Sequence, residues 1–238
     1  MTHPLRSTDH PSSPDGPRRP RLLIFDVNET LSDMSPLRAR FADLGVPEHL
    51  ATTWFAGLLR DCFALTAAGA TAPFADIAAE SLRVLFTAHH TDHPLEDAVT
   101  HVMNGFSSLA VHPDVPDGLR ALADLDIRLV TLSNGAASIA DHLLEAAGVR
   151  DLVERVLSVE DAGVWKPAPE SYAYALAQCA VDPEDAMLVA VHPWDTDGAT
   201  RAGLASAWIN RDHSHYPGYF LSPTLEAASL TDLADQLH

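Results

Sequence analysis

The sequence is short of positive charge and contains a single lysine. Of its 238 residues, 15 are Lys or Arg and 33 are Asp or Glu, which gives a formal net charge of −18. Lys166 is the only lysine, and every other Lys or Arg position is occupied by arginine. So acidic a surface repels phosphate backbones and anionic lipid headgroups, which argues against nucleic acids and membranes as partners. A small molecule is the expected ligand.

Cysteine and long apolar runs are also scarce. Cys62 and Cys179 are far apart and neither belongs to a CxxC pair, so a disulfide framework and a zinc knuckle are both disfavoured. No apolar run approaches the length of a membrane span, and the N-terminus lacks the apolar segment of a secretory signal. These absences together favour a cytoplasmic protein.

The remaining sequence predicts a tail followed by an α/β fold. Residues 1–20 carry five prolines among Ser, Asp and Gly, which predicts a disordered tail, with a docking segment as the less favoured alternative. From residue 21 onward, apolar strand-like runs alternate with helix-like segments. The predicted strands cover residues 21–27, 127–134, 155–160, 185–192 and 205–211, and the predicted helices cover 136–147, 168–180 and 196–203. This alternation is typical of a doubly wound, Rossmann-like parallel sheet.

One region breaks the alternation. Residues 35–110 contain several helix-periodic segments and no convincing strand. The simplest interpretation is a helical cap inserted after the first strand, with an α/β core made of residues 21–34 and 111–238.

Polar residues collect where the predicted strands end. They are Asp26, Asn28, Glu29 and Thr30 after the first strand, Ser133 and Asn134 after the second, Lys166 after the third, and His192, Trp194 and Asp195 after the fourth. Because ligands of open parallel sheets bind outside the carboxyl ends of the strands, these groups are expected to share one crevice.

The segments FDVNETL, TLSNG, VWKP and HPWDTDGA resemble, in this order, the four motifs of the haloacid dehalogenase superfamily. The resemblance covers residues 21 to about 211 and is closest to the type II 2-haloacid dehalogenases, whose helical cap also follows the first strand. It implies a hydrolase without a cofactor that forms a covalent aspartyl ester, and it implies a possible homodimer because related enzymes commonly pair.

The resemblance also implies a role for each matching residue. Asp26 would be the nucleophile, Lys166 would neutralise it, and Asp195 would help to activate the water that hydrolyses the ester. The expected substrate-binding residues are Asn28, Thr30, Phe55, Ser133, Asn134, Tyr172 and Trp194.

Elementary chemistry agrees with the pairing of Asp26 and Lys166. Desolvation alone would raise the pKa of a buried aspartate and protonate it, which would disable nucleophilic attack. A fixed ammonium opposes this effect. Lysine is a compact point charge whereas arginine is a larger planar fork, which gives a reason for the single surviving lysine.

A magnesium-dependent phosphatase is the main alternative within the superfamily. Such enzymes carry a second aspartate two positions after the nucleophile, where this chain has Asn28, whose amide is a poor proton donor. They also carry a magnesium-binding aspartate where this chain has Val191, which cannot ligate a hard cation. Both differences favour metal-independent attack at a carbon atom, and no metal site is expected.

The dehalogenase pattern is incomplete as well. Its halide-binding arginine follows a tryptophan, and the matching pair here is Trp54-Phe55; Arg38 or Arg60 could compensate. His192 replaces an asparagine, and Glu29 stands where glycine is usual. Because histidine transfers protons near neutral pH, His192 could act as a base or a proton donor, or it could simply form a structural hydrogen bond.

These departures leave three hypotheses. The first is a 2-haloacid dehalogenase with a rearranged halide site. The second is the same ester chemistry on another electrophilic carbon, such as an epoxide or aziridine ring. The third, a non-catalytic binding protein, is disfavoured by the intact Asp26, Lys166 and Asp195 set.

Overall fold

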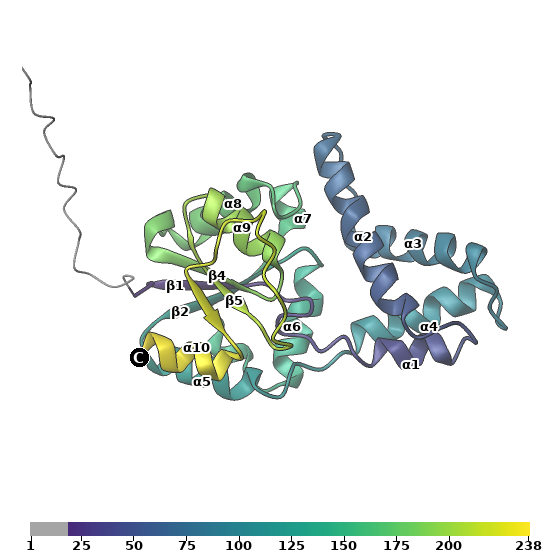
Figure 1. Cartoon of the computed structure of the whole chain (residues 1–238), viewed down its shortest axis with the longest axis horizontal. Helices are drawn as coiled ribbons and strands as arrows, with labels where there is room; N and C mark the ends of the chain where they lie inside the picture. The colour runs from purple at the N-terminus through teal and green to yellow at the C-terminus, as the bar shows by residue number, and fades with distance from the viewer. Residues whose placement is uncertain (1–18) are drawn as a thin grey trace, which may run out of the picture.

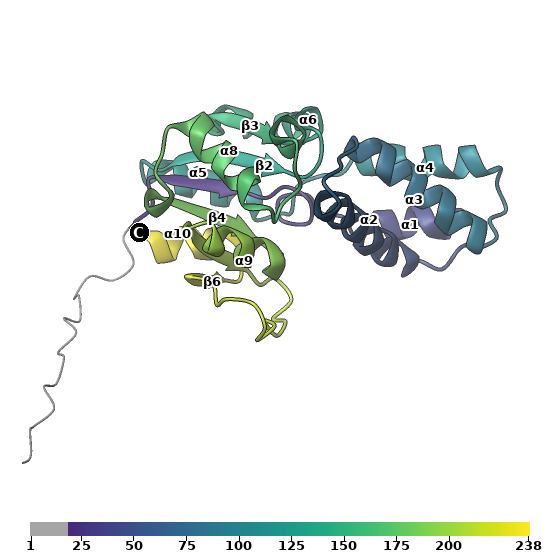
Figure 2. The same cartoon turned by 90° about the horizontal axis from the view of Figure 1, so that it is seen from above.

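The computed structural model describes residues 19–238, which form an α/β unit beside a group of four helices (Figures 1 and 2). The tail predicted for residues 1–20 lies almost entirely outside the described residues. The strands are β1 (Leu22–Phe25), β2 (Arg128–Ser133), β3 (Arg155–Ser158), β4 (Ala186–Ala190), β5 (Ala205–Ile209) and β6 (Leu225–Ala227). The helices are α1 (Leu37–Ala42), α2 (Leu50–Ala67), α3 (Phe74–Ala88), α4 (Leu95–Ser107), α5 (Val115–Asp124), α6 (Ala137–Ala146), α7 (Val159–Ala162), α8 (Pro169–Cys179), α9 (Pro193–Arg201) and α10 (Leu230–Leu237). Two short 3-10 helices are η1 (Arg150–Leu152) and η2 (Pro183–Asp185).

All strand pairs in the sheet are parallel, in the order β3-β2-β1-β4-β5-β6. The predicted doubly wound parallel sheet is therefore confirmed. The strand order reverses at β1, which lies between β2 and β4. The residues that follow β1 consequently emerge at the switch point, where parallel sheets form their ligand crevice.

Alternate side chains of β1 pack on opposite faces of the sheet. Leu22 and Ile24 belong to an apolar cluster with residues of α8 and α9, while Leu23 and Phe25 belong to a second cluster with residues of α5, α6 and α10. All four side chains are fully buried. A strand buried on both faces reads as a continuous apolar run, which is why β1 was visible in the sequence.

The four-helix group, α1 to α4, lies between β1 and α5 in the chain. Its two connections to the sheet run side by side, with an antiparallel bridge between Ser32 and Val111. The amide of Asp33 donates to the carbonyl of Ala110, and the amide of His112 donates to the carbonyl of Leu31, both at 2.8 Å. The expected cap, residues 35–110, lies between these two connections.

The interior of the helical group is aromatic and joins the sheet's own core. Trp54 is 2% exposed, packs against Phe41 and Phe106 with ring centroids 6.2 Å away in each case, and donates through Nε1 to the Ser81 hydroxyl at 2.8 Å. Its apolar cluster continues into residues of β1 and α8. This continuous packing joins the inner face of α2 to the core on one side of the sheet.

Several element boundaries differ from the prediction. The strand predicted for 155–160 ends at Ser158, because the Ser158 hydroxyl caps α7 by accepting from the amide of Glu160 at 3.1 Å. The helix predicted for 196–203 begins earlier, at Pro193, since proline suits the first helical position. Strand β6 and helices α5 and α10 had no counterpart among the predicted elements.

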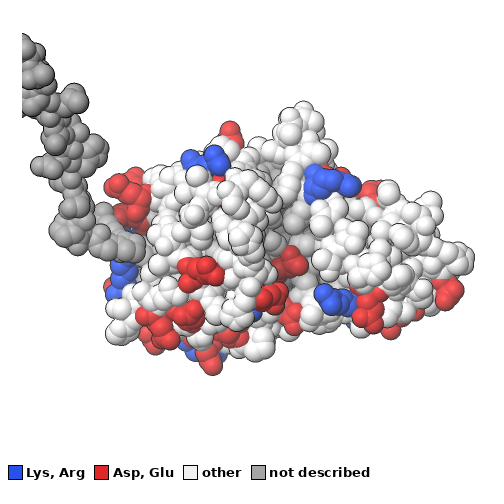
Figure 3. Space-filling view, viewed as in Figure 1, with Lys and Arg blue, Asp and Glu red and all other residues white. Residues whose placement is uncertain are grey.

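On the face drawn in Figure 3, acidic side chains cover more surface than basic ones, and they gather over the α/β unit around α5 and α10. No helix formed by residues 19–238 is both long enough and apolar enough to cross a membrane.

Candidate active site

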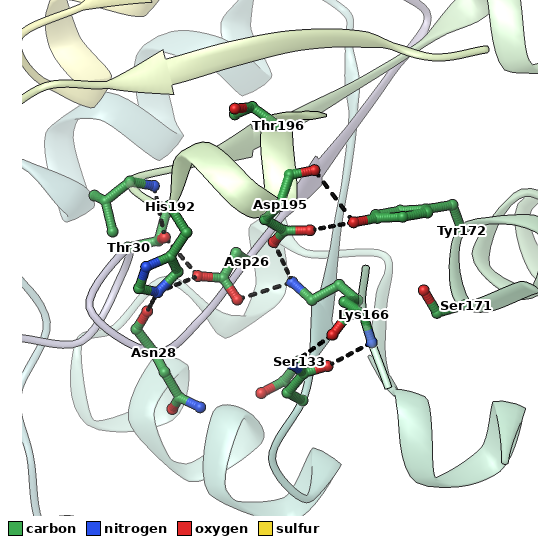
Figure 4. A network of polar contacts seen from close by, with 12 residues as sticks. Asp26, Asn28, Thr30, Ser133, Lys166, Ser171, Tyr172, His192, Asp195 and Thr196 are labelled. Carbon is green, nitrogen blue, oxygen red and sulfur yellow. Dashed lines mark hydrogen bonds and ion pairs between the residues drawn. The ribbon is translucent and has the colours of Figure 1, made fainter. Parts of the chain in front are cut away.

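The polar groups that follow β1, β3 and β4 converge on one buried ionic cluster (Figure 4). Lys166 Nζ lies 2.9 Å from Asp26 Oδ1 and 2.5 Å from Asp195 Oδ2. Lys166 and Asp195 are fully buried, and Asp26 is 2% exposed. One ammonium therefore stands between two carboxylates inside the protein, as expected where strand ends meet at the switch point.

Burial and ion pairing act in opposite directions on this cluster. Burial would raise the pKa of Asp26, but Lys166, His192 and the Thr30 hydroxyl hold it below its ordinary value. Burial would lower the pKa of Lys166, but Asp195 and Asp26 hold it above its ordinary value. Burial raises the pKa of Asp195, with Lys166 opposing this change. The arrangement thus favours an ionised Asp26 beside a protonated Lys166.

Neighbouring side chains fix Lys166 and its partner Asp195. The Tyr172 hydroxyl donates to Asp195 Oδ1 at 2.6 Å, and Asn134 binds the backbone of Lys166, accepting from its amide at 3.0 Å. Gly198 in α9 permits this packing, since a Cβ there would lie 2.6 Å from both the Tyr172 hydroxyl and the Pro167 ring. Tyr172 and Asn134, both predicted substrate-binding residues, contact catalytic candidates in the structure.

Thr30 connects the turn after β1 to the end of β4. Its hydroxyl donates to Asp26 Oδ2 at 2.6 Å and accepts from the amide of Val191 at 3.1 Å. Thr30 is fully buried. It therefore orients the Asp26 carboxylate while tying two strand ends together.

His192 lies two residues beyond the end of β4, close to Asp26. Its ring faces three oxygen atoms. Its Nε2 lies 3.1 Å from the carbonyl of Asn28, 3.6 Å from Asp26 Oδ2 and 3.7 Å from Glu29 Oε2. The ring stacks on Trp194 with a centroid distance of 5.0 Å. Trp194 itself packs edge-on against Phe63 of α2, so it supports His192 from behind.

Glu29 adopts a left-handed backbone conformation, with φ of 63°. Glycine enters this region without a Cβ penalty, which explains physically why it is usual at this position in the family that the sequence resembles. Burial raises the pKa of the Glu29 carboxyl, with His192 opposing the change and Asp26 adding to it. A partly buried carboxyl, carried by a left-handed backbone, thus lies beside His192.

Two cavities lie beside residues that surround the cluster, and neither is lined by Asp26, Lys166 or Asp195. A cleft of about 620 Å³ is lined by Glu29, His192, Phe55 and Val191 near the cluster, and by Arg38 among the residues further out. A smaller cavity of about 70 Å³, largely apolar, is lined by Asn28, Ser133, Phe74, Met103 and Phe106 among others.

Some of the predicted site residues therefore line a cavity, whereas others are buried behind the cavity walls. Phe55, Asn28, Ser133 and His192 border a cavity, whereas Asp26 borders neither. The Ser133 hydroxyl also accepts from the amide of Gly135 at 2.8 Å.

The two arginines considered as replacements for a halide-binding cation have different positions. Arg38 lines the large cleft, whereas Arg60 lies on the surface with 74% of its side chain exposed and binds Asp61 at 2.8 Å. Arg60 is therefore not a replacement. Phe55, in the position that resembles the arginine, is 3% exposed and lines the cleft.

Sequence reasoning missed part of the cleft wall. His112 lies with its Nε2 2.9 Å from the carbonyl of Glu29, and Arg211 binds Asp114 at 2.6 Å and the carbonyl of Thr30 at 3.0 Å. Both line the cleft. Arg211 follows β5 at its carboxyl end, so the switch-point rule could have pointed to it. His112 reaches the site only through the pairing of the two connections.

The donor set offers little to a metal ion. At the position where related phosphatases carry a metal-binding aspartate, Val191 presents an apolar side chain to the cleft. Among residues 19–238, no group of three His, Cys, Asp or Glu side chains has a geometry that could hold a metal ion.

Comparison with known proteins places this arrangement among related enzymes. The family model described as haloacid dehalogenase-like hydrolase matches residues 20–203. The chain is 27% identical over 211 residues to an (S)-2-haloacid dehalogenase of Pseudomonas sp. (strain YL), covering 87% of this chain and 90% of the relative.

Solved structures show the same architecture. The L-2-haloacid dehalogenase RSc1362 superposes with a TM-score of 0.86 at 27% identity, covering 91% of this chain and 98% of the other. The L-2-haloacid dehalogenase from Xanthobacter autotrophicus, solved with chloropropionic acid covalently bound, superposes with a TM-score of 0.82 at 22% identity, covering 91% and 98%. The second likeness supports the fold alone.

Proposed function

This chain belongs to the haloacid dehalogenase-like hydrolases, and we propose that it uses Asp26 to displace a leaving group from an sp3 carbon, as in the hydrolysis of 2-haloacids. The observation that carries the proposal is the buried contact of 2.9 Å between Asp26 and Lys166. A carboxylate attacks carbon only when it is ionised and held in place. Lys166 provides the first condition, and the Thr30 hydroxyl contributes to the second.

The first step forms an ester between an Asp26 oxygen and the substrate carbon while the bond to the leaving group breaks. Lys166 stays protonated throughout, because its ammonium is buried in contact with the carboxylates of Asp26 and Asp195. The leaving group takes the bonding electron pair. The substrate is thereby bound covalently to Asp26.

The second step hydrolyses this ester at the Asp26 carboxyl carbon. Asp195 is the proposed base for the attacking water, since burial raises its pKa and thus its affinity for a proton. Tyr172 holds Asp195 by donating to it at 2.6 Å. Hydrolysis returns Asp26 to its carboxylate form and releases a hydroxylated product.

Halide release from a panel of 2-haloacids tests the proposed reaction. We expect the unmodified protein to release halide and the Asp26→Asn variant to release none above the uncatalysed rate. Circular dichroism and gel filtration show whether that variant is folded. Turnover by folded Asp26→Asn would contradict the assignment of the nucleophile.

The four-helix group is proposed as the cap that determines substrate choice, because α2 contributes Phe55 and α1 contributes Arg38 to the cleft. A homodimer stays a prediction, which light scattering of the purified protein checks.

A further inference from the structure

His192 has the environment of a proton donor. Each of the three atoms near its Nε2 is an oxygen that accepts hydrogen bonds: the Asn28 carbonyl at 3.1 Å, an Asp26 carboxylate oxygen at 3.6 Å and a Glu29 carboxyl oxygen at 3.7 Å. Because its neighbours are acceptors, Nε2 carries a proton in the neutral ring as well as in the imidazolium. A donor therefore stands beside the proposed nucleophile.

The surroundings of His192 suit a leaving atom that departs as a neutral group. Phe55 and Val191, which are apolar, and the Glu29 carboxyl line the cleft beside His192. A halide departs as an anion and is stabilised by cations, whereas a carboxylate repels it. Arg211, one cation of the cleft wall, is already bound to Asp114 and the Thr30 carbonyl. An oxygen or nitrogen that receives a proton as it leaves has no such need for a cation.

We propose that this site also opens strained three-membered rings, the epoxides and aziridines, with His192 protonating the ring atom that leaves. The inference rests on the proposed function for its nucleophile, Asp26. It differs in the leaving group, which stays tethered to the substrate and does not have to exit. The shared chemistry of both ring types is attack at carbon coupled to protonation of the departing heteroatom.

An epoxide is opened by attack of Asp26 on one of its ring carbons. An Asp26 oxygen bonds to a ring carbon, the bond from that carbon to the ring oxygen breaks, and this oxygen keeps the electron pair. The imidazolium of His192 gives its Nε2 proton to the oxygen and becomes neutral imidazole. Water then hydrolyses the ester to release a vicinal diol, and the proton freed in this step returns to His192. The sum is epoxide plus water giving diol.

Glu29 is placed to stabilise the charged ring of His192 through its carboxylate. Its Oε2 lies 3.7 Å from Nε2, and it borders both His192 and the open cleft. The left-handed backbone at this position, with φ of 63°, favours glycine, yet the chain carries a glutamate there. A side chain retained against a backbone preference is a reason to look for a role in the chemistry.

The cleft is large enough for a complete organic substrate. Its volume of 620 Å³ lies within the range of about 300–1,000 Å³ that is typical of small-molecule sites. Its wall combines apolar surface from Phe55 and Trp208 with the polar groups of His192, Glu29 and Arg38. This composition offers both apolar and polar contacts to a substituent on the ring.

The test compares two probes with the same carbon skeleton, oxirane-2-carboxylate and 2-chloropropanoate, together with one uncharged aryl epoxide. Product diol is measured by mass spectrometry and chloride by ion chromatography. We expect the unmodified protein to form diol from at least one epoxide. His192→Asn should lower diol formation by about 100-fold or more, the usual contribution of a general acid, and should lower halide release by a much smaller factor.

The diol and chloride assays together separate three outcomes. If the unmodified protein opens neither epoxide, the inference is overturned, and the chloride assay then reports separately on the proposed function. If folded His192→Asn loses diol formation and halide release by the same factor, His192 has only a positioning role and the proton donation is overturned. Diol formation that depends selectively on His192 supports the inference.

Discussion

The ammonium of Lys166 lies 2.9 Å from the carboxylate of Asp26, although the two residues are 140 positions apart in the chain and both are buried. The protein's single lysine therefore stands where a compact positive charge is needed. Arginine would have to fit a planar fork between Asp26 and Asp195, which Lys166 contacts with one nitrogen at 2.9 and 2.5 Å.

Replacing Lys166 by methionine should disable the nucleophile. Burial would then act on the Asp26 carboxyl without the opposing ammonium, so its pKa would rise. Because attack requires the carboxylate, ester formation should fall by about 100-fold or more, and the acid limb of its pH profile should move to higher pH. Single-turnover rates measured across pH test this.

The same variant should be less stable, since removing one partner of a buried ion pair costs about 3–5 kcal/mol. Urea unfolding is the necessary control. An unchanged acid limb in folded Lys166→Met protein would contradict the electrostatic role.

Gly198 and Gly57 form a matched pair for testing the packing behind the site. A Cβ at Gly198 would lie 2.6 Å from both the Tyr172 hydroxyl and the Pro167 ring, whereas a Cβ at Gly57 meets nothing within 4 Å. We expect Gly198→Ala to destabilise the protein by about 1–3 kcal/mol through overpacking. Gly57→Ala, inside α2, should stabilise it by about 0.5–1 kcal/mol. Urea unfolding of both variants measures the difference, and equal effects would contradict the packing described here.

Arg38 and Arg60 allow a second comparison. Arg38 lines the cleft, while Arg60 is exposed and binds Asp61. Arg38→Gln should raise KM for an anionic substrate by up to about fivefold, since an exposed charge contributes at most about 1 kcal/mol. Arg60→Gln should leave KM unchanged. Steady-state kinetics at low and high salt check both variants, and the Arg38 effect should shrink in salt.

Phe55→Arg should increase halide release. The new guanidinium would enter the cleft wall beside His192 and stabilise a departing anion. A gain of about tenfold in kcat corresponds to about 1.4 kcal/mol of transition-state stabilisation. Phe55→Leu is the control for the loss of the ring. If the Phe55→Leu and Phe55→Arg variants release halide at the same rate, the charge of residue 55 does not determine the rate of halide release.

The sheet was predictable because its central strands are buried on both faces. Leu22 to Phe25 form a continuous apolar run, and the polar residues of the site follow such runs directly. By contrast, β6 covers only Leu225–Ala227, which is too short for its pattern to stand out. The boundary at Ser158 depended on a side-chain cap that periodicity does not register.

The site was only partly predictable, because some of its residues meet through tertiary packing. Asp26, Lys166 and Asp195 come after strands that the α/β pattern predicts, so the switch-point rule brought them together. His112 comes close to Glu29 because the two connections of the four-helix group pair, and Trp194 lies behind His192 because it packs on Phe63. Neither relationship leaves a signal in one sequence.

Oxygen transfer through Asp26 is the central claim, and a single turnover in heavy-oxygen water tests it most directly. With enzyme in excess over a substrate found in the halide or epoxide assays, the Asp26 peptide is analysed by mass spectrometry. The account predicts that one heavy oxygen enters the Asp26 carboxylate and that the first product carries ordinary oxygen. Heavy oxygen in the first product, with an unlabelled Asp26 peptide, would contradict the ester intermediate.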